Sequence, residues 1–264
     1  HSIKNPEKFW QEASEDIFWF KKPTKILNKS KPPFYKWFED GVTNTCYNAL
    51  DIHIDQGRGK KKALIYDSPI TGNKSELTYE ELRSKVSKFA GALRAQGTNK
   101  GDRVIIYMPM IPEAVVAMLA CARIGAIHSV VFGGFASSEL ASRIDDSKAK
   151  ILVTASCGFE PGKTVEYKPL VDEAIKIAKH KIDKMILFQR PGHEVKLDKN
   201  NEVSWGEVIS NSKDADCVEM KSNEFAYILY TSGTTGTPKG IVRDIGGHIV
   251  ALKWTMKNIY NIDT

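Results

Sequence analysis

The sequence predicts an α/β protein whose mostly parallel sheet is covered by helices on both faces. Between residues 103 and 189, short and continuously apolar segments alternate with segments of helical period. Continuous apolar strands are typical of parallel sheets that are buried on both faces. The 264 residues are 42% hydrophobic and 27% charged, which is the composition of a globular protein with one large domain or two smaller ones.

The first 50 residues carry many aromatic side chains and little periodicity. Large exposed aromatic rings would promote association. We therefore predict an irregular N-terminal layer whose rings pack onto a larger body. The aromatic residues of this layer are Phe9, Trp10, Phe18, Trp19, Phe20, Phe34, Tyr35, Trp37 and Phe38.

The first clear helix begins after Thr78. Thr78 and Glu81 are spaced as a capping box, in which the threonine hydroxyl accepts a first-turn amide and the glutamate reaches back. Gly97 supplies the left-handed residue that ends a helix. Between them, apolar residues follow at helical spacing, namely Leu82, Val86, Phe89, Ala90 and Leu93.

The alternating region predicts strands and helices in turn, joined by right-handed connections. The helix over 137–146 is expected to be capped by Ser137 or Ser138. Residues 190–224 are polar and predict an irregular or edge segment, the strand over 225–230 follows it, and another helix is expected to start near Asp244. The other predicted elements are strands over 104–108, 127–132, 151–155 and 185–189 and helices over 112–123 and 167–180.

Charge and cysteine usage exclude several classes of protein. The net charge of +6 is mild, and the longest basic run, Lys60–Lys62, lacks interleaved aromatics, so a nucleic-acid partner is not predicted. Arg123 and His128 interrupt the most apolar stretch, which argues against membrane insertion. The cysteines have no zinc-type spacing and predict reduced thiols in an intracellular protein, with no metal site. They are Cys46, Cys121, Cys157 and Cys217.

Residues 230–240 read Tyr-Thr-Ser-Gly-Thr-Thr-Gly-Thr-Pro-Lys-Gly and predict a phosphate-binding loop. Glycines let the backbone approach a phosphate, successive amides form an anion nest, and Lys239 adds positive charge. This is not the P-loop of nucleoside triphosphatases, because Pro238 takes its glycine position and Gly240 replaces its Ser/Thr metal ligand. His128 is interpreted as a core or rim histidine with its hydrogen bonds satisfied, rather than a ligand or general base. His248 is interpreted as a surface residue.

The same eleven residues are similar to the AMP-binding signature of the acyl-adenylate-forming superfamily. Segments 37–51, 107–113 and 120–135 narrow the resemblance to acetyl- and propionyl-CoA synthetases, and residues 242–247 resemble the propionyl-CoA synthetase branch. The resemblance implies the N-terminal subdomains of the adenylate-forming fold, with an acetyl-CoA synthetase-type extension over 1–55 and the first part of the AMP-binding domain over 56–264. The later family motifs, which include the Mg²⁺-binding segment and the C-terminal lysine, are expected beyond Thr264.

The resemblance also implies site residues. Lys239 is the expected catalytic residue. The turn formed by Glu160, Pro161, Gly162 and Lys163 is expected to contact the nucleotide part of CoA, and Lys163 stands where the family usually has an arginine; a solvated turn is the alternative interpretation. The residues expected to bind the phosphates of ATP are Thr231, Ser232, Gly233, Thr234, Thr235, Gly236 and Lys239.

The implied function is that of an ATP-dependent, AMP-forming short-chain acyl-CoA synthetase, of which this chain is the N-terminal portion and is inactive alone. The expected substrate is propionate or acetate, the expected cofactors are ATP, Mg²⁺ and CoA, and the expected compartment is the mitochondrial matrix or the cytoplasm. Two alternatives stay open. One is a catalytically silent phosphate- or CoA-binding fragment, and the other is an adenylating ligase for another carboxylic acid.

Overall fold

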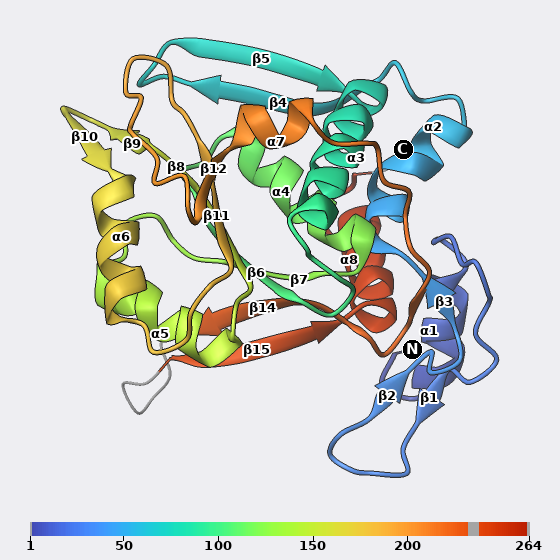
Figure 1. Ribbon diagram of the computed structural model, residues 1–264. Helices are drawn as coiled ribbons and strands as arrows, with labels where there is room; N and C mark the ends of the chain where they lie inside the picture. Colours follow the sequence, from blue (N-terminus) through green and yellow to red (C-terminus); the bar gives the residue numbers. More distant parts are fainter. Residues whose placement is uncertain (1, 232–237, 263–264) are drawn as a thin grey trace.

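The computed structural model describes residues 2–231 and 238–262. Its centre is a seven-stranded sheet in the order β12-β11-β8-β6-β7-β14-β15, in which all neighbours are parallel except the last pair (Figure 1). The mostly parallel α/β fold predicted from the sequence is therefore confirmed. The strands of this sheet are β6 (Arg103–Tyr107), β7 (Ile127–Val130), β8 (Ile151–Ala155), β11 (Lys184–Phe188), β12 (Glu202–Ser204), β14 (Phe225–Thr231) and β15 (Lys239–Asp244).

The remaining strands form two-stranded sheets outside the main sheet, and helices cover both faces of the main sheet. The remaining strands are β1 (Leu27–Asn28), β2 (Lys36–Trp37), β3 (Val42–Thr43), β4 (Lys62–Ser68), β5 (Asn73–Thr78), β9 (Cys157–Glu160), β10 (Lys163–Glu166) and β13 (Met220–Lys221). The helices are α1 (Pro6–Ser14), the π-helical turn η1 (Tyr47–Asp51), α2 (Ile52–Asp55), α3 (Tyr79–Ala95), α4 (Pro112–Ile124), α5 (Ser137–Ser147), α6 (Tyr167–Ile177), α7 (Trp205–Ser210) and α8 (Gly246–Asn258).

The two faces of the sheet have separate hydrophobic cores because side chains alternate along each strand. Val104 and Ile106 of β6 face the core shared with α3, α4 and α7. Ile105 and Tyr107 of the same strand face the core shared with α5 and α6. Figure 1 shows these two helix groups on opposite sides of the strands. The helix after β6 and the helix after β8 thus lie on opposite faces, although the two strands are neighbours.

The N-terminal layer packs largely as expected. Trp19 and Phe38 are buried against Val250 of α8, and the ring of Trp10 lies 6.2 Å from that of Trp254. Phe20, Phe34 and Tyr35 are exceptions, since 37%, 81% and 51% of these residues are exposed. The capping box of α3 is confirmed, with both Thr78–Glu81 hydrogen bonds present.

Four local expectations differ from the structure in whole or in part. Ala136 is the N-cap of α5, because Ser137 and Ser138 already lie inside its first turn, and no side chain caps it. Helix α6 ends at Ile177 rather than His180, because the amide of His180 instead donates to Asp145 Oδ1 at 2.7 Å. The segment 190–224, expected to be irregular or at an edge, does contain the edge strand β12, but it also contains α7 and β13. Finally, β15 occupies residues expected to lead directly into α8.

Candidate functional site

The predicted phosphate loop joins two antiparallel strands at the edge of the sheet. Thr231 and Lys239 are register partners at the ends of β14 and β15, and both are exposed. Ser232, Gly233, Thr234, Thr235 and Gly236 lie outside the described residues. Because β14 is parallel to β7, the loop leaves from the carboxyl edge of the sheet, where open α/β sheets bind ligands.

The end of strand β14 is connected to α5 by a hydrogen bond from Tyr230. The Tyr230 hydroxyl donates to Asp146 Oδ2 at 2.6 Å, and the Arg143 guanidinium lies 5.4 Å from the centre of the Tyr230 ring. Burial and this hydrogen bond to a carboxylate raise the pKa of Tyr230 above its usual value. The tyrosine is therefore a neutral donor at physiological pH, and it fixes the residue that precedes the loop.

The predicted CoA turn is the tip of the β9–β10 hairpin, which continues directly from β8. Glu160 and Lys163 are register partners, and their side chains form an ion pair at 2.9 Å. Gly162 has a φ of +74°, a conformation that L side chains rarely adopt. The structure thus brings the four predicted residues together in one tight turn. Lys163 is 65% exposed in its side chain and is already paired with a carboxylate of the same turn.

A crevice of about 320 Å³ opens next to this hairpin, at the carboxyl ends of β6, β8 and β11. Arg190 is buried in its wall, and its guanidinium carbon lies 4.7 Å from the centre of the Phe159 ring. Sequence reasoning missed Arg190; the available signal was its position directly after a predicted strand. The crevice is lined by Tyr66, Thr71, Asn73, Ile111, Glu113, Phe159, Phe188, Arg190 and Pro191.

Two histidines flank Tyr227 where β14 meets β7. The His128 ring stacks on Tyr227, its Nδ1 has no hydrogen-bond partner among the described residues, and burial lowers its pKa to about 4. His128 is thus a neutral ring in the interior or at its rim, as interpreted from the sequence, but the expectation that its hydrogen bonds are satisfied was wrong, because Nδ1 has no partner among the described residues. The surface position expected for His248 was wrong, because this half-buried ring places Nε2 2.8 Å from the Tyr227 hydroxyl, and burial lowers its pKa.

A group that sequence spacing did not reveal joins the N-terminal layer to the body. Ligand atoms of Cys46, Asp51 and Cys217 lie within 4.8 Å of one another, as in a metal site. The Arg123 guanidinium occupies this cluster, however, with Nη1 2.7 Å from Asp51 Oδ2 and 3.1 Å from Cys217 Sγ. A cation is therefore already present, and the cluster is best described as a buried ion pair flanked by two thiols.

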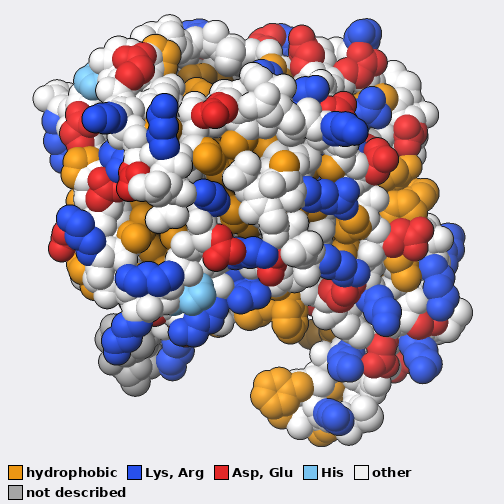
Figure 2. Space-filling model, in the orientation of Figure 1, with side chains coloured by type: hydrophobic (Ala, Val, Ile, Leu, Met, Phe, Trp, Pro, Cys, Tyr) orange, Lys and Arg blue, Asp and Glu red, His pale blue; other side chains and the backbone are white. Residues whose placement is uncertain are grey.

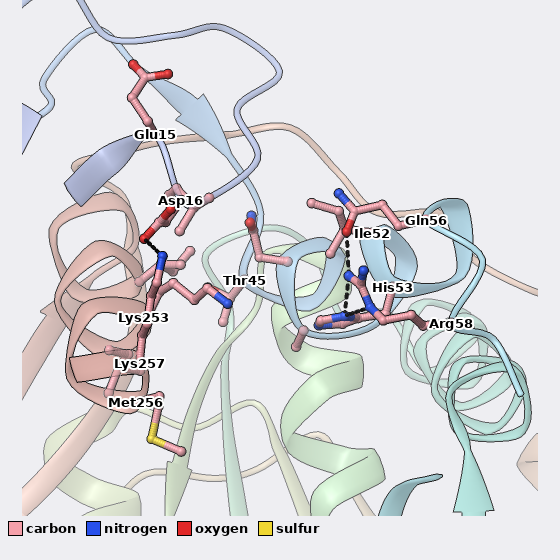
Figure 3. Close-up of a pocket in the computed structure, with 15 residues that line it drawn as sticks. Glu15, Asp16, Thr45, Ile52, His53, Gln56, Arg58, Lys253, Met256 and Lys257 are labelled. Carbon is pink, nitrogen blue, oxygen red and sulfur yellow. Dashed lines mark hydrogen bonds and ion pairs between the residues drawn. The ribbon is translucent and has the colours of Figure 1, made fainter. Parts of the chain in front are cut away.

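A larger cavity, of about 650 Å³, lies between the N-terminal layer, α2 and α8, and contains none of the predicted site residues. Figure 3 shows Glu15 and Asp16 on one side and His53 and Arg58 on the other. Lys257 pairs with Asp16 at 3.1 Å, and Arg58 Nε donates to His53 Nδ1 at 3.0 Å. Burial and the neighbouring Arg58 lower the pKa of His53 to about 4.

The outer surface mixes both signs of charge. Figure 2 shows Lys and Arg side chains interspersed with Asp and Glu over the face that it displays. Among residues 2–231 and 238–262, no helix is long and apolar enough to cross a membrane.

Comparison with known proteins extends over nearly the whole chain. Residues 53–263 match the family model of AMP-binding enzymes, and residues 1–49 match that of the acetyl-coenzyme A synthetase N-terminus. The chain is 53% identical over 262 residues to "Acyl-CoA synthetase short-chain family member 3, mitochondrial" from Rattus norvegicus, which covers 99% of this chain and 38% of the relative. The chain is also 44% identical over 255 residues to "Acetyl-coenzyme A synthetase" from Streptomyces coelicolor, and the match covers 96% of this chain and 39% of the relative.

A solved structure agrees with these relatives. "Acetoacetyl-CoA Synthetase from Streptomyces lividans" superposes with a TM-score of 0.89 at 25% identity, covering 99% of this chain and 40% of that one. The chain thus spans about two fifths of the length of the proteins that it matches. Since the family model covers residues 53–263, this chain belongs to the AMP-binding enzyme family.

Proposed function

We propose that this chain is the N-terminal portion of an ATP-dependent, AMP-forming short-chain acyl-CoA synthetase, which is an acid–thiol ligase. The observation that supports this most strongly is the pair of consecutive family matches over 1–49 and 53–263, together with acyl-CoA synthetase relatives that cover 99% of the chain. We further propose that residues 1–55 of this chain form an acetyl-CoA synthetase-type extension and that residues 56–264 form the first part of the AMP-binding domain.

The first half-reaction would take place at the loop between β14 and β15. An oxygen of the carboxylate attacks the α-phosphorus of ATP, the bond to the β-phosphate oxygen breaks, and acyl-AMP and pyrophosphate form. We assign Thr231–Lys239 to the β- and γ-phosphates, with Lys239 stabilising the charge that moves onto pyrophosphate. Mg²⁺ would neutralise further phosphate charge, and its ligands are assigned beyond Thr264 rather than to residues of this chain.

The second half-reaction would use the β9–β10 hairpin. The CoA thiol loses its proton and attacks the acyl carbonyl carbon, and AMP leaves, so that no covalent enzyme intermediate is needed. We assign Glu160, Pro161, Gly162 and Lys163 to the nucleotide end of CoA. The exposed turn, with Gly162 in a left-handed conformation, offers backbone that a ligand can approach closely.

We propose propionate or acetate as the acid. The relatives named above are a short-chain acyl-CoA synthetase and an acetyl-coenzyme A synthetase, and residues 242–247 resemble the propionyl branch. The mitochondrial name of the first relative supports the mitochondrial matrix as the compartment, with the cytoplasm as the alternative.

The test is acid-dependent exchange between pyrophosphate and ATP, run on this chain and on the protein continued along its native reading frame beyond Thr264. Acetate, propionate and butyrate are compared. We expect exchange in the extended protein alone, fastest with propionate or acetate. Exchange with neither protein would contradict adenylation. ATP or CoA binding without exchange would instead favour the silent phosphate- or CoA-binding fragment, and exchange only with other acids would favour a different ligase.

A further inference from the structure

The crevice beside the β9–β10 hairpin lies where the topology of the sheet reverses. Strands β6 and β8 are neighbours, but α4 follows β6 on one face and α6 follows the β8–β10 segment on the other. Their outgoing chains therefore separate and leave a space at the carboxyl ends of the strands, which is the position where open α/β sheets bind ligands. Ile111 and Glu113 line it after β6, Phe159 lines it from β9, and Arg190 after β11.

Arg190 is a mostly buried residue whose guanidinium has no polar partner among the described residues. Only 7% of the residue is exposed. Within the described part of the chain, no oxygen accepts a hydrogen bond from its guanidinium and no carboxylate forms an ion pair with it. Its nitrogens are not among the fully buried side-chain atoms that lack a partner, so they face the open crevice, where a charged donor without a protein partner is available to a ligand. An anion in the crevice would supply the missing partner.

The position of this guanidinium is fixed by its surroundings. The Arg190 backbone amide donates to Ser156 Oγ at 2.8 Å, which holds the main chain, and the guanidinium carbon lies over the ring of Phe159, one residue before the proposed CoA turn. A guanidinium held in this way presents several donors at once, and it suits the bidentate recognition of phosphate. The rings of Tyr66 and Phe188 line the same crevice and offer apolar surface for a base.

Lys163, the other cation of this region, is less suited to the task. It is exposed and paired with Glu160, and an ammonium group acts as a point charge rather than a fork. Glu113 also lines the crevice and would repel an anion placed close to it. A phosphate is therefore expected on the Phe159 side of the crevice, against Arg190.

We propose that Arg190 is a phosphate-binding residue of this crevice and that its ligand is a phosphate group of the nucleotide end of CoA. In this arrangement Arg190 supplies, from the end of β11, the guanidinium that the β9–β10 turn lacks at Lys163. The inference rests on the proposed function for the identity of the ligand, whereas the guanidinium that faces the crevice does not depend on it.

The test is equilibrium binding of CoA and of pantetheine, which lacks the nucleotide and its phosphates, to this chain. The wild-type chain should bind CoA at least tenfold more tightly than pantetheine. Arg190→Gln should remove most of that difference, and Arg190→Lys, which keeps the charge but loses the fork, should remove part of it. Lys176→Gln, a charge change on the exposed surface of α6, is the matched control and should bind both ligands as the wild type does.

Several results would overturn the inference. They are equal binding of CoA and pantetheine by the wild-type chain, no CoA binding at all, or an unchanged CoA preference in Arg190→Gln. The first two results need only the wild-type chain, so the inference can be tested even if Arg190→Gln fails to fold. Pyrophosphate exchange in the extended protein separates this inference from the proposed function, because adenylation does not use CoA. If the extended protein catalyses pyrophosphate exchange but Arg190→Gln binds CoA as the wild type does, only the inference about Arg190 is overturned and the proposed function stands.

Discussion

Two hairpins at the carboxyl edge of the sheet carry the predicted sites, and they are supported very differently. Hairpin β9–β10 continues from the buried strand β8, and its base packs on Tyr167, which is 6% exposed. Hairpin β14–β15 meets the rest of the sheet through a single register pair, Tyr227 with His128, and most of its residues are exposed or half-buried.

The difference indicates a division of roles between the two regions. The proposed CoA turn continues from a buried strand, and such a base is suited to binding one end of a long ligand, because little ordering is needed when the ligand arrives. An edge hairpin with few contacts belongs to the part of a fold that opens most easily. The predicted phosphate loop thus depends on a few contacts, of which Tyr230 with Asp146 is one. Each prediction below tests this contrast.

The largest expected effect is on the phosphate loop. Lys239→Ala in the extended protein should slow pyrophosphate exchange by about 10²-fold, because removing one preorganised charge from a reacting phosphate has a cost of this order. The fold should be unaffected, since Lys239 is exposed at the end of β15. The measurement is the initial rate of exchange at saturating acid and ATP.

Lys163→Ala is the control for that experiment. It lies in the other hairpin, and it should leave exchange unchanged because adenylation precedes CoA binding. Equal losses of exchange in the two variants would contradict the division between the hairpins.

The second expected effect separates the supports of the two hairpins. Gly133 lies between β7 and α5, against Tyr167, the residue on which the base of hairpin β9–β10 packs. A Cβ at Gly133 would lie 2.0 Å from the Tyr167 hydroxyl, whereas one at Gly240 of the other hairpin would lie 3.1 Å from Ile228 Cγ2. Gly133→Ala should therefore lower the free energy of unfolding by about 1–3 kcal/mol, as overpacking does. Gly240→Ala should change it by less than about 0.5 kcal/mol. Urea unfolding of both variants measures the difference, and similar values would remove the contrast.

The sequence predicted the interior of the fold better than its edge. The parallel strands and the helix beginning after Thr78 follow from apolar periodicity and capping, which are local signals. Strand β15 was missed because its residues, Lys239–Asp244, are mostly exposed and pair with β14 rather than with the buried sheet. Exposed antiparallel edges give only a weak periodic signal.

The candidate site was predictable only where its residues are adjacent in sequence. The turn at Glu160–Lys163 is local and was identified, and its residues lie together. The pairing of β11 with β8 brings Arg190 next to Phe159. Cys217 lies beside Cys46 although the two residues are far apart in the sequence. Such contacts depend on strand order, which no spacing in the sequence encodes.

The third effect concerns the junction of β14 with β7 and depends on pH. Burial lowers the pKa of His128 to about 4, from about 6.5 in an unfolded chain. The folded state thus favours the neutral ring, so its contribution to stability is complete above pH 6.5 and is lost as the pH falls toward 4. The expected loss is on the order of 1 kcal/mol per pH unit in this window.

His128→Gln is the control for the pH dependence. The amide has no proton to gain, so the free energy of unfolding of this variant should vary less between pH 6.5 and 4 than that of the wild type. His53, with its own pKa of about 4, remains in both proteins and cancels from the comparison. Parallel pH profiles would show that His128 does not titrate at the junction.

The smallest expected effect tests the CoA turn itself. Lys163→Ala should weaken CoA binding by only about threefold, because the lysine is exposed, shared with Glu160 and screened by solvent, and such charges contribute about 1 kcal/mol or less. Glu160→Gln releases the lysine from its ion pair and should tighten CoA binding slightly. If Lys163→Ala instead weakened CoA binding more than Arg190→Gln did, the phosphate would be bound at the exposed tip, and the buried base of the hairpin would serve only to hold the turn in place.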